Sequence, residues 1–445
     1  MNFKILHYAL GPSPYRSGGM TVYVENLIQA QYDQGNNISL LYPSGMSLLN
    51  YPNLKIRHYK KNKINYFELK NPLPVPILDG IKNPSIYYTT PTKTKTLLTV
   101  FLESLKPDII HVHTLMGLPK CFLEIAKSLG IKLFYTAHDY YGLCPKTNFI
   151  NNVGTFCGKP SIINCSICNQ NAPNHLYIRL RNEPFILKNK ETISHFKFSS
   201  NKNTILKQSE NKSIYNEEYA ILFEYYKSMF SLFDKIHFNS TVTENVFKKL
   251  LSIPNSLTLP ITHNQIKDNR KIRDFNEIEF RLGYIGNLAE YKGFPFLKKI
   301  LIEIFQTRKN WILKVWGNNN KGNDKDCPNI IYKGRYNNQD IEKIFNEIDL
   351  LIVPSICKET FSLVTLEALS FGIPVIVSSN VGAKDIIKQY DNKFIYQNEN
   401  ELKSIITEIL DDKTILINYN KSIMKKAWGH SMDSHVHNIT NLIYK

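Results

Sequence analysis

Two carboxylates, Glu359 and Glu367, stand eight residues apart in an otherwise mostly apolar stretch. Glu367 lies within the run 363–379, which has no other charged residue. Burying its carboxylate there would be costly unless a partner binds it, and a hydroxyl-rich ligand is a suitable partner. An isolated Glu more often lies on a solvated face, but this setting favours a binding site for a polar small molecule.

The surrounding sequence predicts a strand, a helix and a second strand that position both carboxylates. The apolar run 350–353 fits a strand buried on both faces of a parallel sheet. Thr360 or Ser362 can cap the following helix, and Gly372 ends it before a strand at 375–377. In such sheets the carboxyl ends of the strands are the usual ligand sites.

The length and the charge of the chain limit the classes of function. A chain of 445 residues with 43% hydrophobic residues predicts a globular protein of two domains. Its net charge of +17 is compatible with nucleic acid, an anionic membrane surface or an acidic substrate. We find no zinc-finger, RNA-recognition or helix-turn-helix signature, and we expect no nucleic-acid partner.

The location of the protein is predicted from its apolar runs and its basic segment. The N-terminal run is too short for a signal peptide and reads as a strand at 4–9. The basic segment 177–207 is either a solvated face or a contact for lipid headgroups or a phosphate-bearing acceptor. We therefore expect a cytoplasmic protein, with peripheral contact to the inner face of the cytoplasmic membrane as a further possibility.

A glycine pair, Gly18 and Gly19, follows the first predicted strand and precedes a helical pattern. Glycines at this position allow backbone amides to approach a phosphate at the helix N-terminus, although a simple turn is the alternative. A strand follows at 38–42. The next fifty residues show little periodicity, and we expect an irregular segment that shapes an acceptor site.

Histidines end two further predicted strands. PDIIHVHT ends in His111 and His113, and IKLFYTAHDYYGLCP continues into His138 and Asp139. A histidine at the carboxyl end of such a strand lies where ligands bind, although a buried structural histidine is the alternative. His138 is the stronger candidate, and Asp139 either orients it or contacts an acceptor.

Four of the seven cysteines fall within 25 residues, in the pattern C-x12-C-x7-C-x2-C. Four thiolates suffice for one tetrahedral zinc, and C-x-x-C is a usual chelating half. Since disulfides are disfavoured in the cytoplasm, the alternative is a chance cluster of free thiols. Such a zinc would be structural, with ligands Cys144, Cys157, Cys165 and Cys168.

The stretch E-T-F-S-L-V-T-L-E-A, followed by G-I-P-V-I-V-S, resembles the E-x7-E signature of the retaining glycosyltransferases of family GT4. The resemblance implies the GT-B fold, an α/β architecture of two Rossmann-like domains with a cleft between them. In that family the first Glu lies beside the donor sugar and the second binds the nucleotide ribose. Those roles would fall to Glu359 and Glu367, and GGMTVYVENL matches the family's glycine loop.

The loop GNLAEYKGF departs from the family pattern at one position. Family members usually carry Gly-Arg followed by Lys-Gly, whereas this chain has Gly286, Asn287 and Lys292. One of two cations expected beside the diphosphate is therefore absent. Lys292 would neutralise more of the leaving group, with help from Arg16 or Arg335.

The resemblance assigns the remaining roles residue by residue. It implies catalysis by Glu359, His138 and Lys292, with Asp139 contacting the acceptor. The helix-terminal amides near Ser362 and Leu363 would stabilise the leaving group. The expected donor site comprises Gly18, Gly19, Gly286, Asn287, Lys292, Arg335, Phe361, Ser362, Leu363 and Glu367.

The predicted domains follow from the same reading. Residues 1–255 form an N-terminal acceptor-binding domain with a cysteine-rich insertion at 144–168, and 256–279 form the linker. Residues 280–425 form the nucleotide-sugar-binding domain. The terminal helix, 426–445, returns to the first domain.

We expect transfer of a hexosyl unit from a UDP- or GDP-linked sugar to a glycan or lipid-linked acceptor, with retention of configuration, in bacterial surface polysaccharide or lipopolysaccharide synthesis. No divalent metal is expected to be required for catalysis, which leaves the structural zinc as the one expected metal. Two alternatives remain: a nucleotide-sugar 2-epimerase of GT-B architecture, and a catalytically silent nucleotide-sugar-binding partner. Asn287 in place of Arg is the feature that supports the silent protein.

Overall fold

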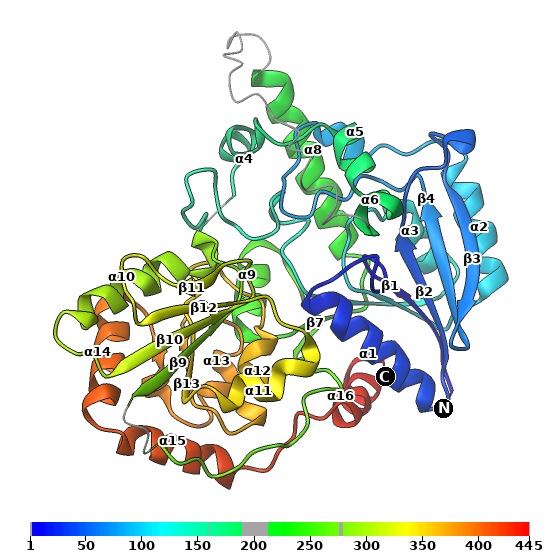
Figure 1. Ribbon diagram of the computed structural model, residues 1–445. Coiled ribbons are helices and arrows are strands. Elements are labelled where there is room, and N and C mark those ends of the chain that lie inside the picture. The colour runs from blue at the N-terminus through cyan, green and yellow to red at the C-terminus, as the bar shows by residue number, and fades with distance from the viewer. Residues whose placement is uncertain (1, 159, 189–211, 276–278, 445) are drawn as a thin grey trace. The chain divides into compact units, whose positions relative to one another are not determined.

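The computed structural model describes residues 2–158, 160–188, 212–275 and 279–444 (Figure 1). The basic segment 177–207 lies outside the described residues beyond residue 188, and so do residues 276–278 of the expected linker. The chain divides into two compact units. Unit 1 comprises Met1–Phe238, Phe247–Leu257 and Val436–Lys445, and unit 2 comprises Asn239–Val246 and Thr258–His435.

The sheet of unit 1 has eight strands in the order β3-β4-β2-β1-β5-β6-β7-β8. Apolar residues predominate in its central strands, and the neighbouring strands from β4 to β7 pair in parallel, as expected for a sheet buried on both faces. The strands are β1 (Lys4–Tyr8), β2 (Asn37–Pro43), β3 (Lys55–Lys61), β4 (Ile64–Lys70), β5 (Ile109–Val112), β6 (Lys132–Ala137), β7 (Lys235–Phe238) and β8 (Ser256–Thr258).

The segment after residue 42 is not irregular throughout, because β3 and β4 form an antiparallel hairpin there. The strands are joined by Asn62 and Lys63, both with positive φ (49° and 65°). Such two-residue turns match the strand twist but usually contain glycine, which is absent here. The outer strand β3 is mostly exposed and lacks the apolar alternation that would have indicated it.

The helices that belong to unit 1 begin with α1, which directly follows the glycine pair. The C-terminal end of the chain, red in Figure 1, lies beside α1, where Gln31 Nε2 donates to the Tyr444 hydroxyl at 3.0 Å. The helices within unit 1 include α1 (Gly19–Asp33), α2 (Thr94–Leu105), α3 (Lys120–Ser128), α4 (Ile162–Asn169), α5 (His175–Arg181), α6 (Pro184–Lys188), α8 (Lys212–Phe230) and the π-helical turn η6 (Ile439–Tyr444). Two more helices, α9 (Thr241–Leu250) and α16 (Met432–Asn438), have residues in both units.

The sheet of unit 2 has seven strands in the order β11-β12-β10-β9-β13-β14-β15. The edge pair β11 and β12 is antiparallel, whereas the other neighbouring strands of this sheet pair in parallel. The strands are β9 (Phe280–Ile285), β10 (Trp311–Trp316), β11 (Lys321–Asn323), β12 (Ile330–Gly334), β13 (Leu350–Val353), β14 (Val375–Ser378) and β15 (Ile395–Tyr396).

The helices of unit 2 alternate with its strands, as expected for parallel β-α-β units. They are η3 (Glu290–Lys292), α10 (Phe294–Phe305), α11 (Ile341–Asn346), α12 (Leu363–Ser370), α13 (Lys384–Ile387), α14 (Glu399–Asp411) and α15 (Thr414–Lys425). Within the described ranges, none of the helices has both the length and the apolar character that a membrane span requires.

Both sheets confirm the predicted Rossmann-like architecture. Read along each sheet, β12-β10-β9-β13-β14-β15 and β4-β2-β1-β5-β6-β7 share the doubly wound order, which reverses direction between two central strands. Such a reversal opens a crevice at the carboxyl ends of those strands. The loops after β1 and β5 in unit 1, and after β9 and β13 in unit 2, are therefore the places to look for ligand chemistry.

Candidate functional site

In unit 2 the loops after β9 and β13 bring Lys292 and Glu359 together. Lys292 Nζ lies 2.8 Å from Glu359 Oε1, and the Ser355 hydroxyl donates to the other carboxylate oxygen. Burial alone would raise the pKa of Glu359, but the Lys292 ammonium and these hydrogen bonds outweigh it and lower that pKa. Both groups are therefore charged at neutral pH, and the charge of each partly offsets the cost of burying the other.

The backbone around Gly293 fixes this pair. Gly293 has φ of 76°, and a side chain at this position would overlap the carbonyl of Pro354 at the end of β13. The carbonyl of Tyr291 also accepts the amides of Ile356 and Cys357, at 3.0 and 3.1 Å. A glycine directly after Lys292 thus lets one loop pack against the other, which places the ammonium beside Glu359.

The N-terminus of α12 follows the pair directly. Ser362 occupies the N-cap position with φ of 92° and ψ of 84°, a left-handed conformation that costs a residue other than glycine about 1–3 kcal/mol. The expected side-chain cap from Thr360 or Ser362 is wrong, because no side-chain capping bond forms there. Phe361 is buried, its carbonyl accepts the Ala383 amide at 2.7 Å, and Leu363 opens the helix.

Glu367 lies on α12 and has a protein partner that the sequence did not indicate. His263 Nε2 lies 2.8 Å from Glu367 Oε1, and His263 is only 2% exposed. The Tyr336 hydroxyl lies close enough that burial and the Glu367 charge raise its pKa to about 12. His263 belongs to the expected linker 256–279, where a lone histidine gave no signal.

Asn287 and Gly286 shape the loop after β9. The Asn287 side chain donates to the Tyr291 hydroxyl at 3.1 Å and accepts the Ala289 amide at 3.2 Å. The Tyr284 hydroxyl donates to the Asn287 carbonyl. The residue that replaces the expected arginine therefore stabilises the loop, while Arg335 is exposed just after β12.

In unit 1 the glycine pair lies where β1 leads into α1. Gly18 has φ of 111° and directly precedes the helix that starts at Gly19. Arg16, which could have served as a second cation, is 7% exposed and donates to Asn182 Oδ1 at 2.9 Å. Its guanidinium also lies over the Tyr15 ring, which holds it within unit 1.

His138 and Asp139 follow β6, as the sequence predicted. His138 Nε2 lies 3.2 Å from His113 Nδ1, and burial lowers the pKa of His138 to about 3, so its ring is neutral at pH 7. Asp139 accepts the Tyr141 amide at 2.9 Å, and burial raises its pKa to about 6 against the effect of its hydrogen bonds. Asp139 thus caps a turn directly after His138.

The four clustered cysteines line one cavity of about 240 Å³ in unit 1. None of the four forms a disulfide, and burial together with the neighbouring thiols raises the pKa of Cys144 to about 11. The donor atoms of three histidines, His7, His111 and His113, all lie within 4.8 Å of one another. Among the described residues, the four cysteines do not form such a close group. The thiols share a cavity but would have to draw closer to hold one ion.

Comparison with known proteins bears on both units. Residues 265–427 match the family Glycosyl transferases group 1, and residues 17–156 match Glycosyltransferase Family 4. An uncharacterised glycosyltransferase of Methanocaldococcus jannaschii is 27% identical over 165 residues, and one of Haemophilus influenzae is 25% identical over 145. These matches span 33% and 30% of this chain, and 41% and 38% of the two relatives' own lengths.

Solved structures resemble the whole chain in fold. HepE of Anabaena, in complex with UDP and glucose, has a TM-score of 0.58 at 13% identity and covers 100% of both chains. WaaG, a glycosyltransferase involved in lipopolysaccharide biosynthesis, has a TM-score of 0.54 at 13% identity and covers 99% of both chains. The two family matches show that the chain belongs to the GT4-type glycosyltransferases, and the likeness to solved structures shows the GT-B fold.

Proposed function

We propose that this protein transfers a hexosyl unit from a UDP- or GDP-linked sugar to a glycan or lipid-linked acceptor, with retention of configuration. The observation that carries the proposal is the Lys292–Glu359 pair at the carboxyl ends of β9 and β13. A departing diphosphate needs a cation, and an oxocarbenium-like sugar is stabilised by a carboxylate. This pair supplies both charges 2.8 Å apart.

Donor binding would use the residues around that pair. Lys292 and the amides at the start of α12 would hold the diphosphate, because a helix N-terminus favours negative charge. Glu367 would accept hydrogen bonds from the ribose, and His263 would hold it in place. Gly286, Asn287, Arg335 and Phe361 would shape the donor site. In unit 1, Gly18 and Gly19 would let a donor phosphate approach the N-terminus of α1. With these charges in place, catalysis would require no divalent metal.

Unit 1 would bind the acceptor. His138, neutral and at the end of β6, would contact the sugar, and Asp139 would lie beside the acceptor. A lipid-diphosphate acceptor would suit the basic surplus of +17 and peripheral contact with the inner face of the cytoplasmic membrane. A role in surface polysaccharide synthesis is supported by the likeness to WaaG and by a match of 26% identity to a protein in the cps region of Klebsiella pneumoniae.

The test is a screen of UDP- and GDP-sugars by thermal shift, followed by assays of nucleotide release. A bound donor should raise the melting temperature by mass action. Wild type should release nucleotide diphosphate, and Glu359→Gln should bind the same donor but release at least about 100-fold less. Release of nucleotide together with a C2-inverted sugar, without acceptor, would identify an epimerase. Binding without release by wild type and variants alike would identify a silent binding protein.

We further propose that the four cysteines bind one structural zinc. The support is that Cys144 and Cys157, in the loop before α4, line one cavity together with Cys165 and Cys168, which lie on α4. A zinc would stabilise this loop beside Asp139, since binding energy adds to folding energy. Protein purified under reducing conditions should contain one zinc per chain, lost with chelator. A metal content far below one would contradict the proposal.

A further inference from the structure

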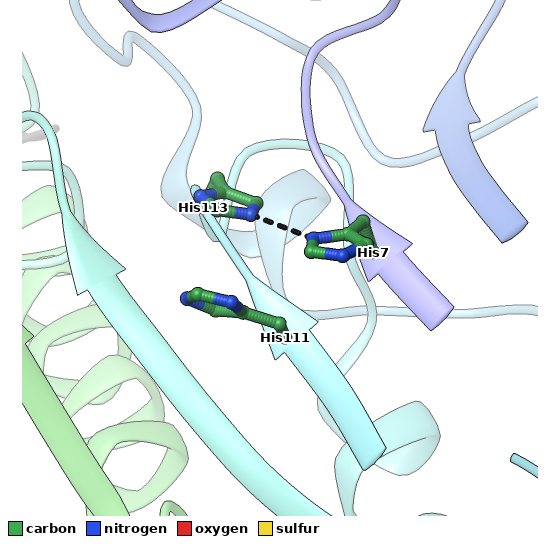
Figure 2. Close-up of side chains that lie close together, drawn as sticks. All are labelled: His7, His111 and His113. Carbon is green, nitrogen blue, oxygen red and sulfur yellow. Dashed lines mark hydrogen bonds between the residues drawn. The ribbon is translucent and has the colours of Figure 1, made fainter. Parts of the chain in front are cut away.

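Unit 1 contains a group of polar side chains that lie in its interior rather than on its surface. Six of them, His7, Gln31, His111, His113, Thr136 and His237, are 0% exposed. Figure 2 shows His7, His111 and His113 close together, with a hydrogen bond between His7 and His113. Buried polar groups are costly unless they are hydrogen-bonded, so their partners merit a full account.

The parallel register of the sheet places these side chains side by side. His7 on β1 is paired with His111 on β5, and Thr136 on β6 is paired with His237 on β7. His113 and His138 come directly after β5 and β6. The side chains therefore form a layer across the sheet, near the point where its strand order reverses.

One hydrogen-bonded chain runs from Gln31 to His138. Gln31 Oε1 lies 2.8 Å from His7 Nε2, and His7 Nδ1 lies 3.0 Å from His113 Nε2. His113 Nδ1 in turn lies 3.2 Å from His138 Nε2. Two successive imidazoles, those of His7 and His113, thus connect one amide to the histidine proposed to contact the sugar.

A second chain starts from the other end of the same amide. Gln31 Nε2 donates to the Tyr444 hydroxyl at 3.0 Å, which lies 2.8 Å from His111 Nδ1. His111 Nε2 lies 2.7 Å from Thr136 Oγ1, which lies 3.0 Å from His237 Nδ1. Gln31 is therefore shared by both chains.

The three rings of the first chain are neutral, and the direction of each hydrogen bond in that chain therefore follows from Gln31. Burial lowers the pKa of His7 to about 4 and that of His138 to about 3, and it also lowers the pKa of His113. A neutral imidazole has one N–H donor and one acceptor nitrogen. Each ring that accepts on one side must therefore donate on the other.

The amide nitrogen of Gln31 donates to Tyr444, so its oxygen accepts from His7 Nε2. His7 Nδ1 then accepts from His113 Nε2, and His113 Nδ1 accepts from His138 Nε2. We propose that Gln31 is a positioning residue that sets the Nε2–H tautomer of His138 through His7 and His113. In this tautomer His138 Nδ1 is the acceptor nitrogen of the ring; the further step, that His138 contacts the sugar, rests on the proposed function.

A metal ion is the competing explanation, since the donor atoms of His7, His111 and His113 lie within 4.8 Å of one another. However, both ring nitrogens of each of these residues already lie within hydrogen-bond distance of a protein group. An ion would have to displace these bonds. The observed contacts therefore favour a network of protons.

The test is nuclear magnetic resonance of protein labelled with ¹⁵N-histidine, in which two-bond correlations distinguish the two tautomers. Wild type should show the Nε2–H form for His7, His113 and His138, assigned by single substitutions. A dominant Nδ1–H form of His138 would overturn the proposal. The proposal would also be overturned by one metal ion per chain together with histidine rings that show neither the Nε2–H nor the Nδ1–H form.

Two variants extend the test. Gln31→Met should leave His138 as a mixture of tautomers and lower kcat about tenfold, with donor affinity changed less than twofold. Thr136→Val interrupts only the second chain, so it should alter His237 and leave His138 unchanged. An unaltered His138 in Gln31→Met would overturn the proposal. The tautomers of wild type can be measured even if Gln31→Met does not fold. They can also be measured without transferase activity, so a failure of the proposed function can be told apart from a failure of this proposal.

Discussion

The two units place different chemistry at the same position of the same fold. In unit 1 the strands at the reversal, β1 and β5, carry His7 and His111 in register, and burial keeps the imidazole of His7 neutral. In unit 2 the corresponding strands, β9 and β13, lead to Lys292 and Glu359, which are both charged. The fold therefore fixes where a site forms, while the side chains fix whether it stabilises charge or directs protons.

Removing the cation of unit 2 should have the largest effect. Lys292→Ala should lower kcat/KM by about 10²–10³, because the departing diphosphate and Glu359 both lose their partner. Lys298→Ala is the matched control, because Lys298 pairs with the carboxylates of Asp324 and Asp326 but lies on α10, outside the proposed donor site. Steady-state kinetics with the donor found in the screen measures both variants. Wild-type rates in Lys292→Ala would remove the functional contrast between the units.

Two glycine substitutions can separate the contribution of loop packing to stability from that of backbone strain. Gly293→Ala should lower the free energy of unfolding by about 3 kcal/mol, because left-handed strain is added to the overlap with the Pro354 carbonyl. Gly130 in unit 1 has nearly the same φ, 73°, with open space around it, so Gly130→Ala should cost about 1 kcal/mol. Urea unfolding measures both. Equal losses would mean that the loop contact adds nothing.

The pH dependence of stability should differ between the units. His7 and His138 have folded pKa values of about 4 and about 3, below the value of 6.5 in the unfolded chain. The unfolded state therefore binds more protons below pH 6.5, and each histidine should cost about 1.4 kcal/mol per pH unit as the pH falls from 6.5 towards 4. Glu359, whose pKa is lowered, adds to the free energy of unfolding at neutral pH, and this contribution is lost only as the pH falls below about 4.5.

Hydrogen exchange read by mass spectrometry can assign these two windows to their units. Peptides of unit 1 should lose protection between pH 6.5 and 4, while peptides around Glu359 keep theirs until lower pH. Substituting the exposed His58 by Gln provides the control, since it should not shift either window. Simultaneous loss of protection in both units would contradict the contrast drawn between them.

The pair Glu367–His263 should give the smallest effect. Glu367→Gln keeps the shape but removes the charge that His263 faces at 2.8 Å, which should cost about 1 kcal/mol of stability. If Glu367 also binds ribose, nucleotide affinity should fall about tenfold in isothermal titration calorimetry. His263→Gln should lower stability by a similar amount while changing affinity less, and the opposite ranking would assign ribose binding elsewhere.

Parts of the fold and of the site were predictable because their signals are local. The apolar run at β13 and the glycine that ends α12 fixed those elements, and both predicted Rossmann-like sheets are present. The hairpin β3–β4 was missed because its outer strand is exposed and its turn lacks glycine. His263 was missed because it lies 104 residues from Glu367 in a segment without periodicity.

The sequence by itself determined that Glu359, Glu367, Lys292 and His138 would stand at the ends of strands or the start of a helix. Only the tertiary structure decided their partners: Lys292 with Glu359, His263 with Glu367, and Gln31 with Tyr444 and His7. The physical reason is that periodicity and turn chemistry act over a few residues. Gln31 and Tyr444 are 413 residues apart, and their contact depends on how the sheet and the C-terminal segment of unit 1 pack together.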